Sequence, residues 1–126
     1  MSVKLAGSRF LTVDSATTEY PTNGATGAGS TTATDSILET CSKTLLDGFL
    51  LLTAHTSATT ITIYQHDGTT VVHTLSIALN QACPYYIPLG GPNGLEVPSG
   101  IGAKTSNTAT TGHLYFRRAD SAGYVD

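Results

Sequence analysis

Short stretches in which apolar and polar residues alternate run through this chain, and such alternation predicts β-strands. Segments of this kind lie at 9–13, 95–97, 101–106 and 112–118. The last two are expected to pair with each other, with Leu114 and Phe116 facing inward. The segment 45–54 is apolar at both alternating positions, which is typical of a strand covered on both faces.

The clearest local structure is a hairpin over residues 58–79, centred on Asp67-Gly68. Asp-Gly often forms a two-residue turn, but that register would scatter the apolar residues over both faces. A three-residue loop, His66-Asp67-Gly68, with Gly68 in the left-handed conformation, instead pairs Ile63 with Val71 and Ile61 with His73. We predict this loop because the buried face sets the register. The apolar face then consists of Ile61, Ile63, Val71, Leu75, Ile77 and Leu79.

Prolines mark the segment 83–89 as an edge strand. Pro84 and Pro88 share one parity, and the opposite parity carries the face made of Cys83, Tyr85, Ile87 and Leu89. The two positions without an N–H group therefore lie on the same lateral side of the strand. That arrangement is tolerated only if this side is unpaired.

The segment Ile37–Leu46 fits either a helix or two strand pieces. A capping box at Ser36 and Glu39, with apolar residues at helical spacing, favours a helix. Residues 40–44 are mostly poor helix formers, which favours strands instead. We predict strands at Ile37–Cys41 and Leu45–Ala54, joined by a turn near Ser42–Lys43.

The segment 14–35 is rich in Thr, Ala, Gly and Ser, and its bulky residues are Tyr20 and Pro21. It is too long for an ordinary connection within a compact domain. Two interpretations stay open: a flexible surface loop, or an extended arm that is ordered only against a neighbouring subunit.

These patterns divide the chain into three regions: a short strand and an arm or loop at 1–36, a β-sandwich core at 37–118, and a tail without a pattern of its own at 119–126. About eight short strands, with turns every 8–12 residues, predict an all-β fold. We expect a single-domain antiparallel β-sandwich or jelly roll.

The composition argues against several classes of function. Charged residues make up 12% of the chain, about half the usual share. The net charge is −3 and the six basic residues are scattered, with Arg117 and Arg118 adjacent, so no nucleic-acid partner is expected. Arg117 and Arg118 fit either a solvated strand end or a salt bridge to a partner subunit. No apolar run reaches the roughly 20 residues of a membrane span, so no membrane partner is expected.

The N-terminus lacks the apolar stretch of a secretory signal, so the chain is expected to be made and folded in a cytoplasm. In that setting, Cys41 and Cys83 are expected to be buried thiols rather than a disulfide.

Motifs for chemistry are weak. Ser99–Thr105 resembles a phosphate-binding loop, but Ala103 and Pro98 stand where that motif needs glycine. The histidines lack the spacing of paired metal ligands, and His73 is expected in the core. No nucleophile elbow or carboxylate pair is found, so we expect no enzyme activity, no cofactor and no metal. The histidines are His55, His66, His73 and His113.

From Leu45 onward the chain resembles small virion structural proteins of tailed bacteriophages. The resemblance lies in the apolar strand 47–52, the Thr-rich strand 59–64 with its Gly turn, the segment 88–95 and the closing strand 114–117. It implies a capsid decoration (cement) protein: a β-sandwich on the virion surface, often a homotrimer, that binds the major capsid protein and stabilises contacts between capsid subunits.

The candidate partner-contact residues come from the arm, the edge strand and the basic pair: Tyr20, Pro21, Pro84, Tyr86, Pro88, Arg117 and Arg118. An alternative function is a tail-fibre or adhesin-type domain that binds a host-surface carbohydrate. The aromatic candidates for that function are Tyr20, Tyr64, Tyr85, Tyr86 and Tyr124.

Overall fold

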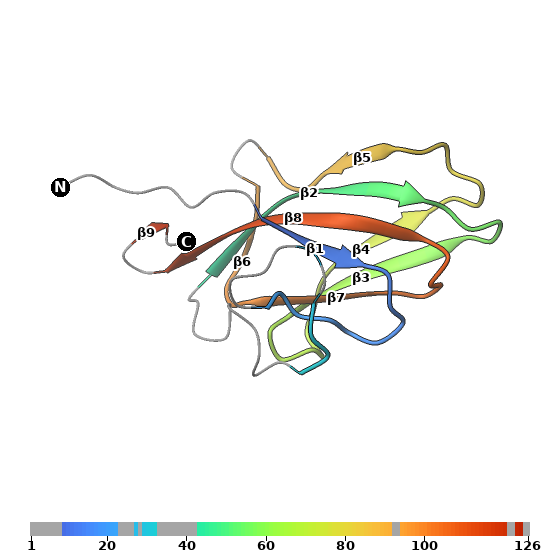
Figure 1. Ribbon diagram of the computed structural model, residues 1–126. Helices are drawn as coiled ribbons and strands as arrows, with labels where there is room; N and C mark the ends of the chain where they lie inside the picture. Colours follow the sequence, from blue (N-terminus) through green and yellow to red (C-terminus); the bar gives the residue numbers. More distant parts are fainter. Residues whose placement is uncertain are drawn as a thin grey trace.

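The computed structural model describes residues 9–22, 27, 29–32, 43–91, 94–120 and 123–124. They form two antiparallel β-sheets, and Figure 1 looks onto the larger one. Its main strands follow the order β1-β8-β2-β5, with β6 paired to β2 and β9 paired to β8. The smaller sheet has the order β4-β3-β7. The predicted all-β, sandwich-like architecture is confirmed.

The strands of the larger sheet are β1 (Arg9–Val13), β2 (Lys43–Thr53), β5 (Tyr85–Pro88), β6 (Leu95–Val97), β8 (Thr111–Asp120) and β9 (Gly123–Tyr124). Those of the smaller sheet are β3 (Thr59–Gln65), β4 (Val71–Ile77) and β7 (Ile101–Thr105).

One apolar core lies between the sheets. It forms because alternate residues of each strand point to the same face. Phe49, Phe116 and Leu114 come from the larger sheet, and Ile61 and Ile63 from the smaller one; all five are buried. Leu114 and Phe116 therefore face inward as predicted. Full burial of one such side chain contributes about 1.5–3 kcal/mol to folding.

The β3–β4 hairpin has the predicted buried face over four residues: Ile61, Ile63, Leu75 and Ile77. Its register differs from the prediction, because Ile63 pairs with His73 and Ile61 with Leu75. Gly68 is left-handed as expected, with φ of 73°. However, the hydrogen bond from Gln65 N to Thr70 O (2.9 Å) closes a loop of four residues rather than three.

A β-bulge on β4 explains the rest of the difference. The register shifts between Ile63 and Tyr64, so that Val71 pairs with Tyr64 and the next residue, Val72, packs against the core. Val71 and Leu79, both predicted on the buried face, are 54% and 57% exposed. His73, predicted in the core, is also exposed, because β4 is the edge strand of its sheet.

The predicted pairing of the last two long strands is wrong. β7 pairs with β3, whereas β8 pairs with β1 and β2 in the other sheet. The connection 106–110 thus crosses from one sheet to the other. In the region 119–126, which has no sequence pattern of its own, β8 continues to Asp120 and pairs there with β9.

β2 begins at Lys43, so the predicted turn near Ser42–Lys43 does not include Lys43. The predicted strand Ile37–Cys41 lies outside the described residues. Leu46 and Phe49 of β2 face the core, and Leu45 on the opposite side is only 5% exposed, which fits a strand covered on both faces. A second bulge separates Leu46 from Gly48.

The described part of the segment 14–32 packs on the chain's own sandwich. Glu19 and Ala103 exchange two backbone hydrogen bonds (2.9 and 3.0 Å), which places this segment along the outer edge of β7. Tyr20 is buried, and its ring lies where Gly68 and Gly102 leave room for it. For these residues, neither a flexible loop nor an arm ordered only by a neighbour describes the structure.

Cys83 is an exposed free thiol at the start of β5, so the expected burial is wrong for this residue. It lies on the loop before the edge strand, where its Sγ atom donates to the carbonyl oxygen of Gln81 (3.2 Å). Cys41 lies outside the described residues.

Candidate functional site

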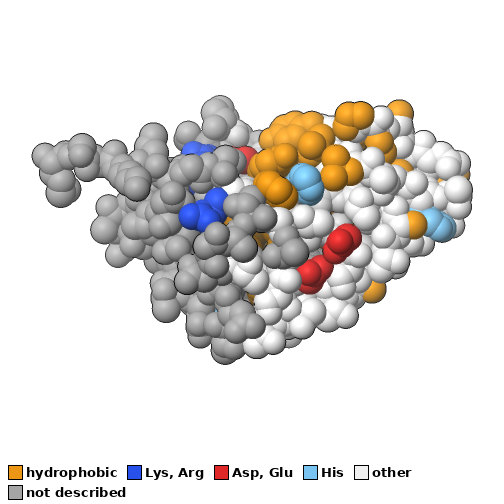
Figure 2. All heavy atoms as spheres, viewed as in Figure 1, with side chains coloured by type: hydrophobic (Ala, Val, Ile, Leu, Met, Phe, Trp, Pro, Cys, Tyr) orange, Lys and Arg blue, Asp and Glu red, His pale blue; other side chains and the backbone are white. Residues whose placement is uncertain are grey.

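The outer face of the larger sheet carries a grid of apolar and aromatic side chains. Strand pairing aligns Thr12, His113, Leu50 and Tyr86 in one row across β1, β8, β2 and β5. It aligns Phe10, Tyr115, Gly48 and Pro88 in the next row. We call these eight residues the aromatic face. Figure 2 looks onto it and shows hydrophobic side chains gathered beside a histidine.

Three rings form the centre of the aromatic face. Phe10 stacks on His113, with ring centroids 4.2 Å apart and planes 25° apart. Tyr115 lies 5.8 Å from Phe10 and meets His113 edge-on at 6.3 Å. Aromatic pairs at these distances contribute about 0.5–1.5 kcal/mol each beyond their area burial. The rings therefore hold one another in place on the sheet while staying partly open to solvent.

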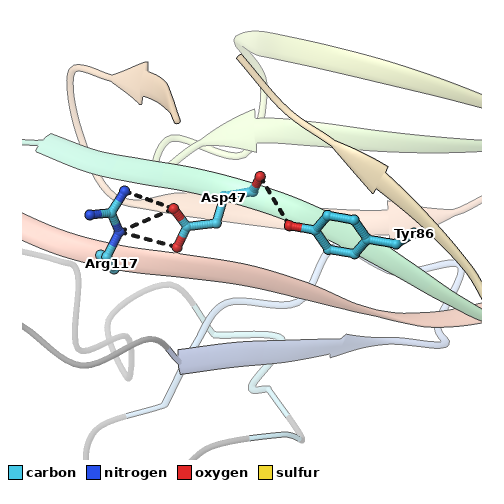
Figure 3. A network of polar contacts seen from close by, with 3 residues as sticks. All are labelled: Asp47, Tyr86 and Arg117. Carbon is cyan, nitrogen blue, oxygen red and sulfur yellow. Dashed lines mark hydrogen bonds and ion pairs between the residues drawn. The ribbon is translucent and has the colours of Figure 1, made fainter. Parts of the chain in front are cut away.

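Tyr86 lies across Gly48 at one side of this cluster, and Figure 3 shows its hydroxyl directed toward the backbone of Asp47. A Cβ atom on Gly48 would overlap the tyrosine ring and hydroxyl, so glycine is what lets the ring lie flat on β2. The Tyr86 hydroxyl donates to the backbone oxygen of Asp47 (3.3 Å). About half of the Tyr86 side chain (49%) remains exposed, so its free side is open to a partner.

An ion pair lies next to the aromatic face, at the bulge of β2. The Arg117 guanidinium donates to Asp47 through Nη2 (2.7 Å) and through Nε to both carboxylate oxygens (3.1 Å each), as Figure 3 shows. Both side chains are about a quarter exposed. Two-pronged pairs of this kind fix the orientation of the guanidinium.

An uncharged end of the sandwich continues this surface. The loops 54–58, 78–84 and 106–110 contain no Lys, Arg, Asp or Glu, and the end of the molecule at the right in Figure 2 shows no such side chain. His55 joins the three loops, because its carbonyl accepts from Asn80 N (2.9 Å) and its N–H donates to Thr110 Oγ1 (3.1 Å). Leu52, Leu79 and Tyr85 are 38%, 57% and 47% exposed.

The edge strand β5 lies where these two apolar regions meet. Leu89 N donates to Asp47 O (3.1 Å), so the odd-numbered residues of β5 direct their backbone groups to β2. Pro88 therefore has the opposite orientation, with its ring nitrogen toward the unpaired side, and Pro84 immediately precedes the strand. The edge strand predicted from these prolines is thus β5, the outermost strand of the larger sheet on this side.

The predicted contact residues separate into three groups. Pro84, Tyr86 and Pro88 are exposed on or beside β5. Tyr20 and Pro21 are buried within the domain, so they are not part of the candidate surface. Arg117 is paired with Asp47 of the same chain, and Arg118 contributes its backbone to β8 opposite Thr44.

Sequence reasoning missed the centre of the aromatic face: Phe10, Leu50, His113 and Tyr115. The alternation of inward and outward residues along β8 contained the signal for two of them. If Leu114 and Phe116 face inward, then His113 and Tyr115 must face outward. The alternation could not show that β1 pairs with β8, because β1 lies about 100 residues before β8 along the chain.

The described residues show no pocket and no group of three or more side chains suited to hold a metal ion. Nor does this part of the chain contain a helix that could cross a membrane. One carboxyl pair is present: burial, and then the neighbouring Asp14, raise the pKa of Glu19. In the hairpin loop, the Thr70 hydroxyl and the N–H groups of Thr70 and Thr69 lower the pKa of Asp67 to about 2.

Comparisons with models of protein families, with curated proteins and with solved structures give no significant match to this chain. What the aromatic face binds is therefore inferred from its own chemistry and from the sequence resemblance described above.

Proposed function

We propose that this chain is a structural virion protein, a capsid decoration or cement subunit that binds the outside of a shell through the aromatic face and the adjoining edge strand β5. The observation that carries the proposal is the grid of outward apolar side chains on a sheet surface that has no pocket among the described residues. Small-molecule sites are concave and enclose their ligand. An open sheet surface fits another protein surface better.

The chemistry of the surface supports a protein partner. Interface cores are rich in Tyr, Phe and Met and poor in charge, and their charged groups lie at the rim. Here the rings of Phe10, His113 and Tyr115 lie in the centre, and Tyr86 and the Asp47–Arg117 pair lie beside them. A stable interface needs about 800 Å² from each partner. The uncharged end adds the exposed apolar side chains of Leu52, Leu79 and Tyr85, of which Tyr85 lies on the opposite face of β5 from Tyr86.

The resemblance to phage virion proteins supplies the identity of the partner, the major capsid protein, and the site of action on the virion. It also implies a homotrimer. The proposed partner and the proposed homotrimer both rest on this resemblance, together with the low charge of the chain.

Co-sedimentation with empty shells of the major capsid protein from the same virus tests this function. Tyr86→Ser and Leu50→Ser should each weaken shell binding at least 10-fold, which is about 1.4 kcal/mol. Val71→Ser is the matched control, because Val71 is 54% exposed on the other sheet. It should leave binding unchanged. Shell binding that is equal for all three variants would exclude the aromatic face, and no binding by the unmodified chain would refute the function.

A second candidate is favoured by the exposed rings themselves. Sugars stack on aromatic side chains, so an adhesin-type domain that binds a host-surface carbohydrate would also use Phe10, Tyr115 and Tyr86. Tyr64 is placed differently, on the smaller sheet, where the Lys104 ammonium lies 5.6 Å from its ring centre. Titration with oligosaccharides, followed by NMR shifts of the Phe10 and Tyr115 rings, separates this candidate from the shell protein.

A further inference from the structure

Among the described residues, no segment covers the outer edge of β4, whereas the outer edges of β1 and β7 are covered and that of β5 is blunted. Gly27 bonds to the backbone of β1, from Gly27 N to Phe10 O (2.9 Å) and from Thr12 N to Gly27 O (2.7 Å). The segment 15–19 covers the edge of β7, and the prolines blunt the edge of β5. Among the described residues, no segment pairs with the side of β4 that faces away from β3.

The ladder geometry identifies the free backbone groups on this edge. Thr60 directs its N–H and C=O toward Ser106, away from β4, with bonds of 2.9 Å to the Ser106 Oγ and N atoms. Thr60 is therefore in a non-hydrogen-bonded pair with Ser76. Since backbone directions alternate along a strand, Ser76 and Thr74 both direct their N–H and C=O groups outward. Both residues are exposed.

This edge lacks the devices that normally prevent strand pairing. β4 contains no proline and no Lys, Arg, Asp or Glu, and its bulge lies at the Val72 end, away from Thr74 and Ser76. Natural proteins commonly protect edge strands with charges, prolines or a covering segment. An edge without these devices, in a fold that covers or blunts the edges of β1, β5 and β7, favours a strand-pairing function.

We infer that β4 pairs antiparallel with β4 of a second copy of this chain, about a two-fold axis at Leu75, to give a continuous six-stranded sheet. In this register Thr74 of each copy lies opposite Ser76 of the other, and the two pairs form four backbone hydrogen bonds. Leu75 lies opposite its own counterpart, and the exposed His73 is covered by the Ile77 side chain across the axis.

The occupant is a second copy because the edge is complementary to itself. The same strand supplies donors and acceptors at Thr74 and Ser76 in the order that the two-fold axis requires. The net charge of −3 comes from other parts of the molecule, so the two strands meet without like-charge repulsion. The interface is small, and interfaces below about 1,200 Å² are weak or transient. The dimer should therefore form at high micromolar to millimolar concentration.

Sedimentation equilibrium and an NMR dilution series of the full chain test the pairing. From about 10 µM to about 1 mM, a range that brackets weak association, the mass should rise from 13.0 kDa toward twice that value. Amide shifts should change with concentration at Thr74 and Ser76. A mass that stays at one chain, a trimer, or shifts confined to the aromatic face would overturn the inference. A trimer would instead agree with the homotrimer of the proposed function, whereas the other two outcomes do not bear on shell binding through the other sheet.

A charge swap tests the register. Thr74→Lys/Ser76→Lys places like charges opposite each other across the axis and should abolish the dimer. Thr74→Glu/Ser76→Lys carries as many charged substitutions but places opposite charges across the axis, so it should keep or strengthen the dimer. Equal behaviour of the two variants would overturn the inference. Both positions are exposed, and far-UV circular dichroism confirms that each variant is folded.

Discussion

The Tyr86 ring lies flat on Gly48, and this contact holds the edge strand β5 on β2 alongside the backbone ladder. Gly48 follows the bulge of β2, and the residue before it, Asp47, uses its carbonyl for Tyr86 and its carboxylate for Arg117. The bulge thus joins three strands of the larger sheet through side chains. Several consequences for stability can be measured.

Gly48→Ala should destabilise the fold by about 1–3 kcal/mol, because the new methyl group overlaps the Tyr86 ring. The free energy of unfolding in urea measures this loss. In a Tyr86→Ala background the same substitution should cost clearly less, since the overlap is gone. Gly91→Ala is the control: a Cβ atom there meets open space, and stability should stay within about 0.5 kcal/mol. An equal loss in both backgrounds would show that the ring contact is not the cause.

The Asp47–Arg117 pair should contribute a coupling free energy of about 0.5–1 kcal/mol, because its geometry is two-pronged but its side chains are partly solvated. A double-mutant cycle with Asp47→Ala and Arg117→Ala measures it, and added salt should reduce it. The Lys43–Glu96 pair, at 3.8 Å and largely exposed, serves as comparison and should give a coupling near zero. A larger coupling for Lys43–Glu96 than for Asp47–Arg117 would contradict this ranking.

Thr110→Val should cost about 1–3 kcal/mol, because it removes a buried hydroxyl from a connected set of hydrogen bonds. Thr110 Oγ1 lies 2.9 Å from Thr59 Oγ1 and accepts from His55 N at 3.1 Å. Thermal and urea unfolding measure the effect. Thr108→Val, on the exposed part of the same loop, should be neutral. If the two variants unfold alike, the buried hydroxyl has no special role.

Asp67 should titrate with a pKa of about 2 in the folded chain, below the usual aspartate value of 3.8, because the Thr70 hydroxyl and two N–H groups bind its carboxylate. A lowered folded pKa stabilises the fold above the unfolded pKa, and this contribution is lost as the pH falls from about 3.8 through 2. NMR of the side-chain carboxyl measures the midpoint. Thr70→Val should move the midpoint up toward 3.8, and an unchanged midpoint would exclude the hydroxyl as the cause.

Local patterns predicted the strands well, because a strand's face depends on its own alternation. The segment 9–13 and the segment 95–97 are strands with those bounds, and the prolines of 83–89 correctly indicated an edge. Strand partners were harder to predict. The strands β7 and β8 are adjacent along the chain, yet they pair in different sheets.

Two further misses have physical causes that alternation does not encode. The bulge at Val72 adds one residue to β4, which shifts the hairpin register and turns Val71 outward. Tyr20 lies in a segment without a pattern, and its burial depends on space left by Gly68 and Gly102, which are far away along the chain. The aromatic face was missed for the same reason, because its rows are made by strands distant in sequence.

The position of β8 also constrains how the chain can fold during synthesis. β1 and β2 are not neighbours; each pairs with β8, which extends to Asp120. The larger sheet therefore cannot be completed until the ribosome has made nearly all of the residues described. Until then, the apolar strands β1 and β2 lack the strand that lies between them. Folds dominated by such distant pairings form slowly. We therefore expect the larger sheet to form slowly, because its central strand β8 is the second to last of the described strands.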